Sequence, residues 1–197
     1  SYTITLKFEL GIQLAASNIN LTQNGCTTND KNDLAKLRWA TGNLKSTGST
    51  NYIWAPSQTE IGYYYAFNKL YNGSTGDPCS KLNTAYYGTG WRTPSKNELE
   101  KLSRCTDKVF TNNGMWFMNK SLGVFLKAGG VRQESGSGTN GATYTDHGCY
   151  WTSTIGTSKN AYNMEFWNTE AHVNNTSSWF GLQTNGLLIR CVKGTKQ

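Results

Sequence analysis

Few residues of this chain have the chemistry that acid–base or nucleophilic catalysis needs. Its 197 residues include two histidines, His147 and His172. His147 could be combined with Asp146 and Ser153 into a serine–histidine–aspartate set. No G-x-S-x-G turn surrounds this serine, however, and such a turn is what exposes the nucleophile in the α/β-hydrolases. We therefore expect a protein that is not an enzyme.

The residues that could ligate a metal are scattered along the chain. The five cysteines contain no C-x-x-C pair, which argues against a zinc site. Asp146 beside His147 could hold a metal, but in a polar loop such a pair is usually only solvated. A calcium-dependent sugar site needs a loop such as Glu-Pro-Asn, and no proline follows Pro94. The neighbouring carboxylates Glu98 and Glu100 lie on a predicted surface helix, so we expect no metal and no cofactor.

The chain is basic and rich in aromatic residues. Its formal net charge is +7, while 16% of its residues are charged and 13% are aromatic. The basic residues are spread out, which favours a solvated basic face over a nucleic-acid site. No apolar run approaches the ~20 residues that span a bilayer. We expect neither a nucleic-acid partner nor a transmembrane segment. Because the chain starts at Ser1, we expect a processed or truncated product.

Two capping boxes predict two helices. In each, a serine is followed three residues later by a glutamate, so that each side chain can bond the other residue's backbone amide. Ser57 and Glu60 predict a helix over residues 58–71. Ser95 and Glu98 predict a second helix.

Short strands and turns account for much of the remaining sequence. Alternation of apolar and polar residues predicts a strand over residues 2–9 and a weaker one over 12–21. Further strands are predicted over residues 37–44, 122–127, 150–154, 161–166, 171–174 and 187–192. Helices followed by a small antiparallel sheet indicate the α+β class. A glycine-rich segment, 129–148, is expected to be a long loop that is either functional or disordered.

A polar stretch over residues 22–33 suggests a boundary in the chain, because it contains the turn dipeptide Asn24-Gly25. Residues 1–22 are therefore expected to be an N-terminal strand or arm, or the remnant of a preceding pilin-type domain. Residues 23–197 are expected to form the main domain.

Five motifs occur in an order that resembles a known family. They are Trp91-Arg92-Thr93-Pro94-Ser95 with the helix after it, Phe125-Leu126-Lys127-Ala128-Gly129, Gly148-Cys149-Tyr150-Trp151-Thr152-Ser153, Ala161-Tyr162-Asn163-Met164-Glu165-Phe166, and Arg190-Cys191-Val192. The series is similar to the major paralogous, or FISUMP, domain of bacterial surface lipoproteins and pilus-associated proteins. The resemblance covers roughly residues 39–193.

The resemblance implies a C-type-lectin-like fold, with two helices, a small twisted antiparallel sheet and long loops. Variable proteins of diversity-generating retroelements share this fold and a similar Ala-Tyr…Arg-Cys-Val tail. The opening strand, residues 2–8, resembles a late strand of a fimbrillin-type pilin domain.

The resemblance also implies a disulfide. In lectin-like domains a cysteine after the first helix pairs with one in the last strand, and Cys79 and Cys191 occupy those places. Such a bond would stabilise the fold by about 4–5 kcal/mol in the chain-entropy model. The alternative is two buried free thiols. Cys105 and Cys149 are a further candidate pair.

Alternation along the last strands separates core side chains from exposed ones. Tyr162, Met164 and Phe166 are expected to point into the core, and the residues between them to point outward. Aromatic faces stack on sugars or become buried in protein partners, while amides hydrogen-bond. We expect a ligand-binding surface made of Asn163, Glu165, Trp167, His172, Asn174, Trp179 and Phe180.

Two alternatives remain for this surface. In retroelement variable proteins the corresponding stretch carries the diversified residues, which favours binding. The other interpretation is that Trp167 and Trp179 only cover the core.

The resemblance implies a non-catalytic binding or adhesion module of an exported bacterial surface or pilus protein. The expected partners are a glycan or a host or bacterial surface protein, with other pilus subunits as further candidates. One alternative is a structural pilus subunit in which residues 2–8 pair with a neighbouring chain by strand addition. Another is an enzyme of the formylglycine-generating type, which shares the fold and uses a cysteine pair, whereas Cys191 here looks structural.

Overall fold

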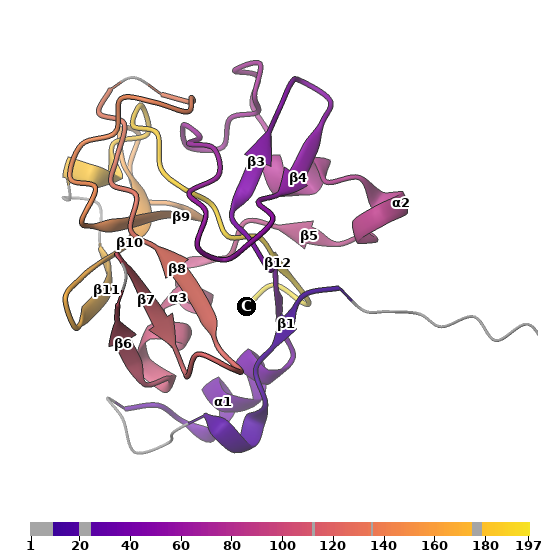
Figure 1. Cartoon of the computed structure of the whole chain (residues 1–197), viewed down its shortest axis with the longest axis vertical. Helices are drawn as coiled ribbons and strands as arrows, with labels where there is room; N and C mark the ends of the chain where they lie inside the picture. The colour runs from indigo at the N-terminus through magenta and orange to yellow at the C-terminus, as the bar shows by residue number, and fades with distance from the viewer. Residues whose placement is uncertain (1–9, 20–24, 112, 135, 175–178) are drawn as a thin grey trace, which may run out of the picture.

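The fold consists of short helices and small antiparallel sheets and is α+β (Figure 1). The computed structural model describes residues 10–19, 25–111, 113–134, 136–174 and 179–197. Within these ranges, no helix has both the length and the apolar character that crossing a bilayer requires.

One sheet joins the two ends of the described chain. Its strand order is β1-β2-β12-β5, with all neighbours antiparallel. The strands are β1 (Ile12–Gln13), β2 (Arg38–Trp39), β12 (Val192–Lys193) and β5 (Trp91–Arg92). Trp39 pairs with both Ile12 and Val192, so part of the predicted N-terminal arm is built into this sheet. The strand predicted over residues 2–9 lies outside the described residues.

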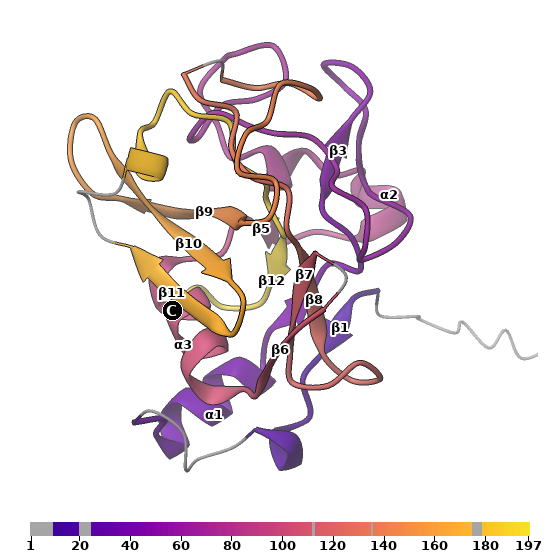
Figure 2. The same cartoon turned by 60° about the vertical axis from the view of Figure 1, so that its left-hand side comes forward.

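A second sheet carries the C-terminal motifs. Its order is β11-β10-β9, formed by β9 (Gly148–Ile155), β10 (Ala161–Trp167) and β11 (Glu170–Asn174). These strands confirm the three predicted over residues 150–154, 161–166 and 171–174. Helix α3 (Lys96–Cys105) contacts all three strands, and α1 (Thr28–Ala35) packs on α3 (Figure 2).

The remaining elements are short. They are the hairpin β3 (Leu44–Ser46) and β4 (Tyr52–Trp54), the sheet β6 (Lys108–Phe110), β7 (Gly114–Phe117) and β8 (Val124–Lys127), helix α2 (Thr84–Tyr87), and the 3-10 turns η1 (Ala16–Asn18), η2 (Pro78–Lys81) and η3 (Trp179–Gly181). Strand β8 confirms the strand predicted over residues 122–127.

The helix predicted over residues 58–71 is wrong. The Ser57 hydroxyl bonds Thr59, and the chain then runs extended through three consecutive tyrosines. Tyr64 belongs to one buried apolar cluster, while Tyr63 and Tyr65 belong to the other. An extended backbone points successive side chains to opposite sides, which a helix does not do. Tertiary burial on both sides therefore overrides the local capping signal.

Helix α3 is confirmed. The Ser95 hydroxyl accepts from the Glu98 amide at 3.2 Å, and the Glu98 carboxylate accepts from the Ser95 amide at 2.7 Å. Helix α1, by contrast, occupies part of the stretch that the sequence suggested as a polar boundary. It begins with a capping box in which aspartate replaces glutamate, formed by Thr27 and Asp30. Its apolar signal is weak because Leu34 is its one large buried apolar residue.

Three predicted strands are much shorter than expected. Of the described residues within 12–21, only Ile12–Gln13 form a strand, and Ala16–Asn18 form a 3-10 turn. Strand β2 covers only Arg38–Trp39 of residues 37–44, and β12 begins only at Val192. Leu187 and Leu188 form single bridges with Tyr65 and Tyr150 instead of a continuous ladder.

Candidate ligand-binding face

The hairpin of β10 and β11 positions the side chains that the sequence assigned to binding. Glu165 pairs with His172, Asn163 with Asn174, and Trp167 with Glu170. Directly opposed residues of antiparallel strands point to the same side of the sheet. The register therefore places the predicted residues of these two strands, Asn163, Glu165, Trp167, His172 and Asn174, on the face of the sheet opposite α3.

Six rings meet on this face. Centroid distances link Tyr144 to Phe180 at 5.5 Å, Trp179 to Phe180 at 5.2 Å, His147 to Trp167 at 5.3 Å, and Trp167 to His172 at 5.1 Å. We call this set the aromatic face: Tyr144, His147, Trp167, His172, Trp179 and Phe180. Tyr144 is 51% exposed and Trp179 is 43% exposed, so the cluster is open to solvent on its outer side.

Two of the predicted binding residues are buried under this face and not exposed on it. Asn163 is 0% exposed and Glu165 is 4% exposed. Turn η3 lies over β10, because a Cβ at Gly181 would be 2.8 Å from the Ala161 carbonyl and 3.0 Å from Asn163 Oδ1. Strand alternation gives the correct side of the sheet, but it does not show that a later turn covers that side.

The opposite error occurs at Tyr162. It was expected in the core, but it is half-buried at the surface, with Lys96 Nζ lying 4.5 Å from the centre of its ring. The pairing of β10 with β9 shifts register between Ala161 and Asn163. A bulge of this kind re-aims the neighbouring side chain.

Tyr144 and His147 were not assigned to the site from the sequence. Both belong to the predicted glycine-rich loop, which folds back on itself through the bridge between Val131 and Thr143. Gly130 has φ +68°, and a Cβ there would clash with the Thr143 carbonyl. The His147 carbonyl accepts from the Gly129 and Gly130 amides, which holds the backbone of the residue whose ring lies next to Trp167. The available signal was the occurrence of an aromatic residue and a histidine in a long glycine-rich loop.

The electrostatics of the face are set by carboxylates. Asp146, whose side chain is 79% exposed, lies 2.9 Å from His147 Nδ1. The hydrogen bond with His147 lowers the pKa of Asp146. Beneath the face, burial and the nearby charges of Glu165 and Asp146 raise the pKa of the Cys149 thiol well above its usual value. A thiol held in this state is a poor nucleophile.

The serine–histidine–aspartate set imagined from the sequence does not assemble. His147 and Asp146 precede β9, whereas Ser153 lies near its far end. Ser153 follows His147 by six positions of extended chain, roughly 20 Å at the usual rise per residue.

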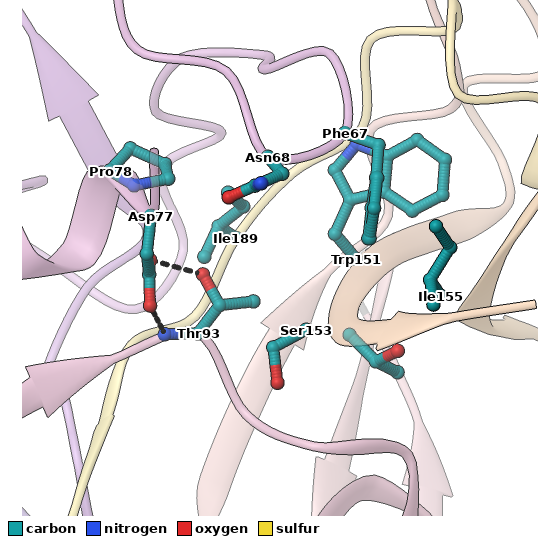
Figure 3. Close-up of a pocket in the computed structure, with 10 residues that line it drawn as sticks. Phe67, Asn68, Asp77, Pro78, Thr93, Trp151, Ser153, Ile155 and Ile189 are labelled. Carbon is teal, nitrogen blue, oxygen red and sulfur yellow. Dashed lines mark hydrogen bonds between the residues drawn. The ribbon is translucent and has the colours of Figure 1, made fainter. Parts of the chain in front are cut away.

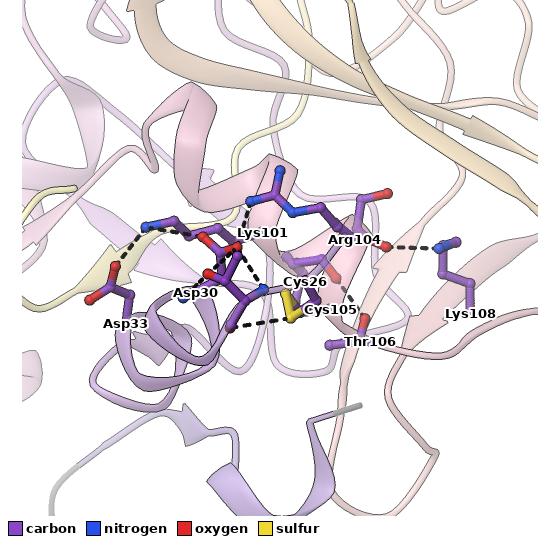
Figure 4. The surroundings of a disulfide bond; sticks show 11 residues. Cys26, Asp30, Asp33, Lys101, Arg104, Cys105, Thr106 and Lys108 are labelled. Atoms are coloured by element: carbon purple, nitrogen blue, oxygen red, sulfur yellow. Dashed lines mark hydrogen bonds and ion pairs between the residues drawn. A yellow bond between two sulfur atoms is a disulfide. The ribbon is translucent and has the colours of Figure 1, made fainter. Parts of the chain in front are cut away.

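The cysteines form two disulfides. Cys79 bonds Cys191, the pair that the family resemblance implies. Cys105 bonds Cys26, so the candidate pairing with Cys149 is wrong (Figure 4). Packing explains the choice: Cys105 and Cys26 lie in one buried apolar cluster, whereas Cys149 lies in the other.

Comparisons of this chain with family models, with curated proteins and with solved structures found no match.

Proposed function

We propose that this chain is a non-catalytic binding module of an exported bacterial surface or pilus protein, with a C-type-lectin-like fold. It contacts a glycan or a protein surface through the aromatic face. The observation that carries the proposal is the gathering of six rings from three separate segments on one face that is partly open to solvent.

The chemistry of the face supports recognition. Large aromatic side chains such as Trp167 and Trp179 have few rotatable bonds and much apolar area, so they lose little entropy when a partner covers them. The carboxylate of Asp146 is bonded to His147, and Asn174 lies on the same side of β11 as His172, so both can orient a partner by hydrogen bonding. The two disulfides are typical of proteins in oxidising compartments outside the cytoplasm.

The test is a binding array of glycans and of host and bacterial surface proteins, probed with the wild-type chain and with the double variant Trp167→Ala, Trp179→Ala. The matched control is Tyr86→Ala. Tyr86 is 70% exposed on α2, which lies on the far side of the molecule from β11 (Figure 1). We expect the double variant to lose binding by at least about tenfold, as at aromatic hot spots, and the control to bind like the wild type.

Equal binding by the double variant and the wild type would remove the proposal. A chain whose rings only cover the fold would then fit better, and the structural pilus subunit would take its place.

A further inference from the structure

A cavity of about 290 Å³ lies where two of the sequence motifs, the segment before α3 and strand β9, meet. Thr93 enters it from the segment before α3, and Trp151, Ser153 and Ile155 enter it from β9. Figure 3 shows Phe67, Trp151 and Ile155 on one side of the cavity, and Asp77 with Thr93 on the other. The cavity shares no lining residue with the aromatic face.

The walls of the cavity are held by covalent and hydrogen bonds. The Asp77 carboxylate accepts from the Thr93 amide at 2.8 Å and from the Thr93 hydroxyl at 2.7 Å. The Ser153 amide donates to the Pro94 carbonyl at 2.7 Å, which joins the two motif segments. The disulfide of Cys79 lies directly after Asp77 and Pro78. A site held in this way loses little entropy when a ligand binds.

The polar side has one acceptor position to spare. The carboxylate of Asp77 accepts three hydrogen bonds, two on Oδ1 from Cys79 and Thr93 and one on Oδ2 from Thr93. A carboxylate offers about four lone-pair sites, so Oδ2 can take one further donor. None of the ten described lining residues is basic, so a ligand that carries its own carboxylate would be repelled.

The Ser153 hydroxyl also lacks a partner. Its Oγ is buried without a hydrogen bond to any described residue. A buried hydroxyl without a hydrogen bond is unfavourable, because it has lost its bonds to water without replacing them. Rotation about one single bond moves this oxygen to another staggered position. Because Ser153 lines the cavity, a ligand hydroxyl there would supply the missing partner.

The opposite side of the cavity is apolar and partly open. Ile155 is 62% exposed, one of the most exposed large apolar residues of the described chain, and Phe67 is half-buried. Phe67 packs edge-on against Trp151 at 5.4 Å, which fixes the orientation of its ring. The volume lies at the lower limit of ligand pockets, about 300–1,000 Å³, and suits a ligand of a single ring.

We propose that this cavity binds one neutral sugar ring. Its C–H face lies against Phe67 and Ile155, and its hydroxyl edge donates to Asp77 and pairs with Ser153. A neutral sugar combines an apolar face with several hydroxyl groups, which matches the two sides of the cavity. This inference does not depend on the aromatic face.

The probes are the methyl glycosides of glucose, galactose, mannose and N-acetylglucosamine, with glucosamine and glucuronate as the charged counterparts. Each is titrated against the full chain, and binding is followed by the shifts of the backbone amide signals. We expect saturable binding of at least one neutral glycoside in the millimolar range, with the largest shifts at Ser153 and Ile155. The charged sugars should bind more weakly.

Two variants test the apolar side. Phe67→Ala should weaken the bound glycoside at least about tenfold, equivalent to about 1.4 kcal/mol. Ile155→Ala removes an exposed side chain and so leaves the fold intact, and it should weaken binding by roughly threefold, since only part of the side chain is covered. The matched control is Leu122→Ala, a comparably exposed apolar residue on the connection between β7 and β8, which should bind like the wild type.

Three results would overturn the proposal. They are the absence of saturable binding by all four neutral glycosides, equal binding by Ile155→Ala and the wild type, and tighter binding of either charged sugar. The double variant Trp167→Ala, Trp179→Ala separates this site from the proposed function, because it should keep the glycoside affinity of the wild type. Loss of glycoside binding in that variant would place the sugar on the aromatic face and also remove the proposal.

Discussion

The buried Arg190 and the aromatic face differ in how far their polar groups are hydrogen-bonded. All five N–H groups of Arg190, which is 1% exposed, have acceptors: Asn43 Oδ1, the carbonyls of Ala40, Gln58 and Phe125, and Gln58 Oε1. Burial lowers the pKa of Arg190 to about 10. At the aromatic face, by contrast, rings contact one another while their outer sides stay in solvent, and Asn163 Oδ1 beneath them has no partner among the described residues.

This difference indicates two roles: the buried guanidinium stabilises the fold, and the partly exposed rings are available for binding. A guanidinium whose donors are all satisfied fixes the relative positions of distant segments, here residues 40, 58, 125 and 190, and has no capacity left for a ligand. Partly exposed rings without obligatory partners stabilise the fold little and keep contact area for another molecule. Substitutions in the first region should therefore change stability, and substitutions in the second should change binding.

The largest stability effect is expected from the bond between Cys79 and Cys191. The two cysteines are 112 residues apart, so replacing both with alanine should cost about 4–5 kcal/mol of unfolding free energy in the chain-entropy model. Chemical denaturation measures the change. Cys149→Ala is the control for loss of a buried sulfur, and it should cost only about 1–2 kcal/mol. Equal losses would show that packing, and not the cross-link, gives the scaffold its stability.

Arg190→Met should cost about 3–5 kcal/mol, because it leaves several buried oxygens without donors. The matched control is Arg132→Met, whose guanidinium bonds the Asn140 and Gly136 carbonyls in an exposed loop. That change should cost no more than about 1 kcal/mol. If both variants unfold at the same denaturant concentration, the contrast between a satisfied core and an open surface fails.

Asp30 tests the ion pairs that join α1 to Lys101 and Arg104 of α3 (Figure 4). Burial alone would raise the pKa of Asp30, but hydrogen bonds from Thr27 and the nearby Arg104 guanidinium outweigh it and hold the pKa below 3.8. A depressed folded-state pKa gives stability that is present above pH ~3.8 and is lost as the pH falls through the folded-state value.

Asp30→Asn should therefore cost about 1–2 kcal/mol at pH 7, as for a cap with an added ion pair, and progressively less below pH ~4. Denaturation at several pH values measures this. Asp33→Asn, which removes a more exposed carboxylate, should have a smaller effect at pH 7. A loss that stays constant down to pH ~2 would contradict the assignment of the effect to the charged carboxylate.

Local sequence signals predict an element correctly where the segments that pack on it are compatible with the same local structure. The capping box of Ser95 and Glu98 predicts α3 correctly, and alternation predicts β9, β10 and β11. The same motif at Ser57 fails, because the three tyrosines that follow are buried on two sides by segments remote in sequence. Helix α1 was missed because aspartate replaces glutamate in its capping box, its one large buried apolar residue is Leu34, and its ion pairs with α3 are long-range contacts.

The candidate site was predictable in part for the same reason. The structure brings together Trp167, His172, Trp179 and Phe180 as the sequence suggested. The burial of Asn163 and Glu165 depends on the path of η3, and the presence of Tyr144 and His147 depends on backbone bonds that close the glycine-rich loop. Both are long-range features, which strand periodicity does not encode.

The smallest stability effect should come from Trp179→Ala. The buried Trp151 provides the comparison, because it is the same residue type in the core. Trp151 is 1% exposed and donates through Nε1 to the Tyr65 carbonyl at 2.7 Å. Trp151→Ala should therefore lower the unfolding free energy by about 3–5 kcal/mol. Trp179 is 43% exposed, and the bond from Asn185 goes to its backbone carbonyl, which the substitution keeps. We expect Trp179→Ala to cost less than about 1 kcal/mol in chemical denaturation while it weakens partner binding. A loss near that of Trp151→Ala would mean that this indole supports the fold, and the aromatic face would then be an edge of the core with no contact area to spare.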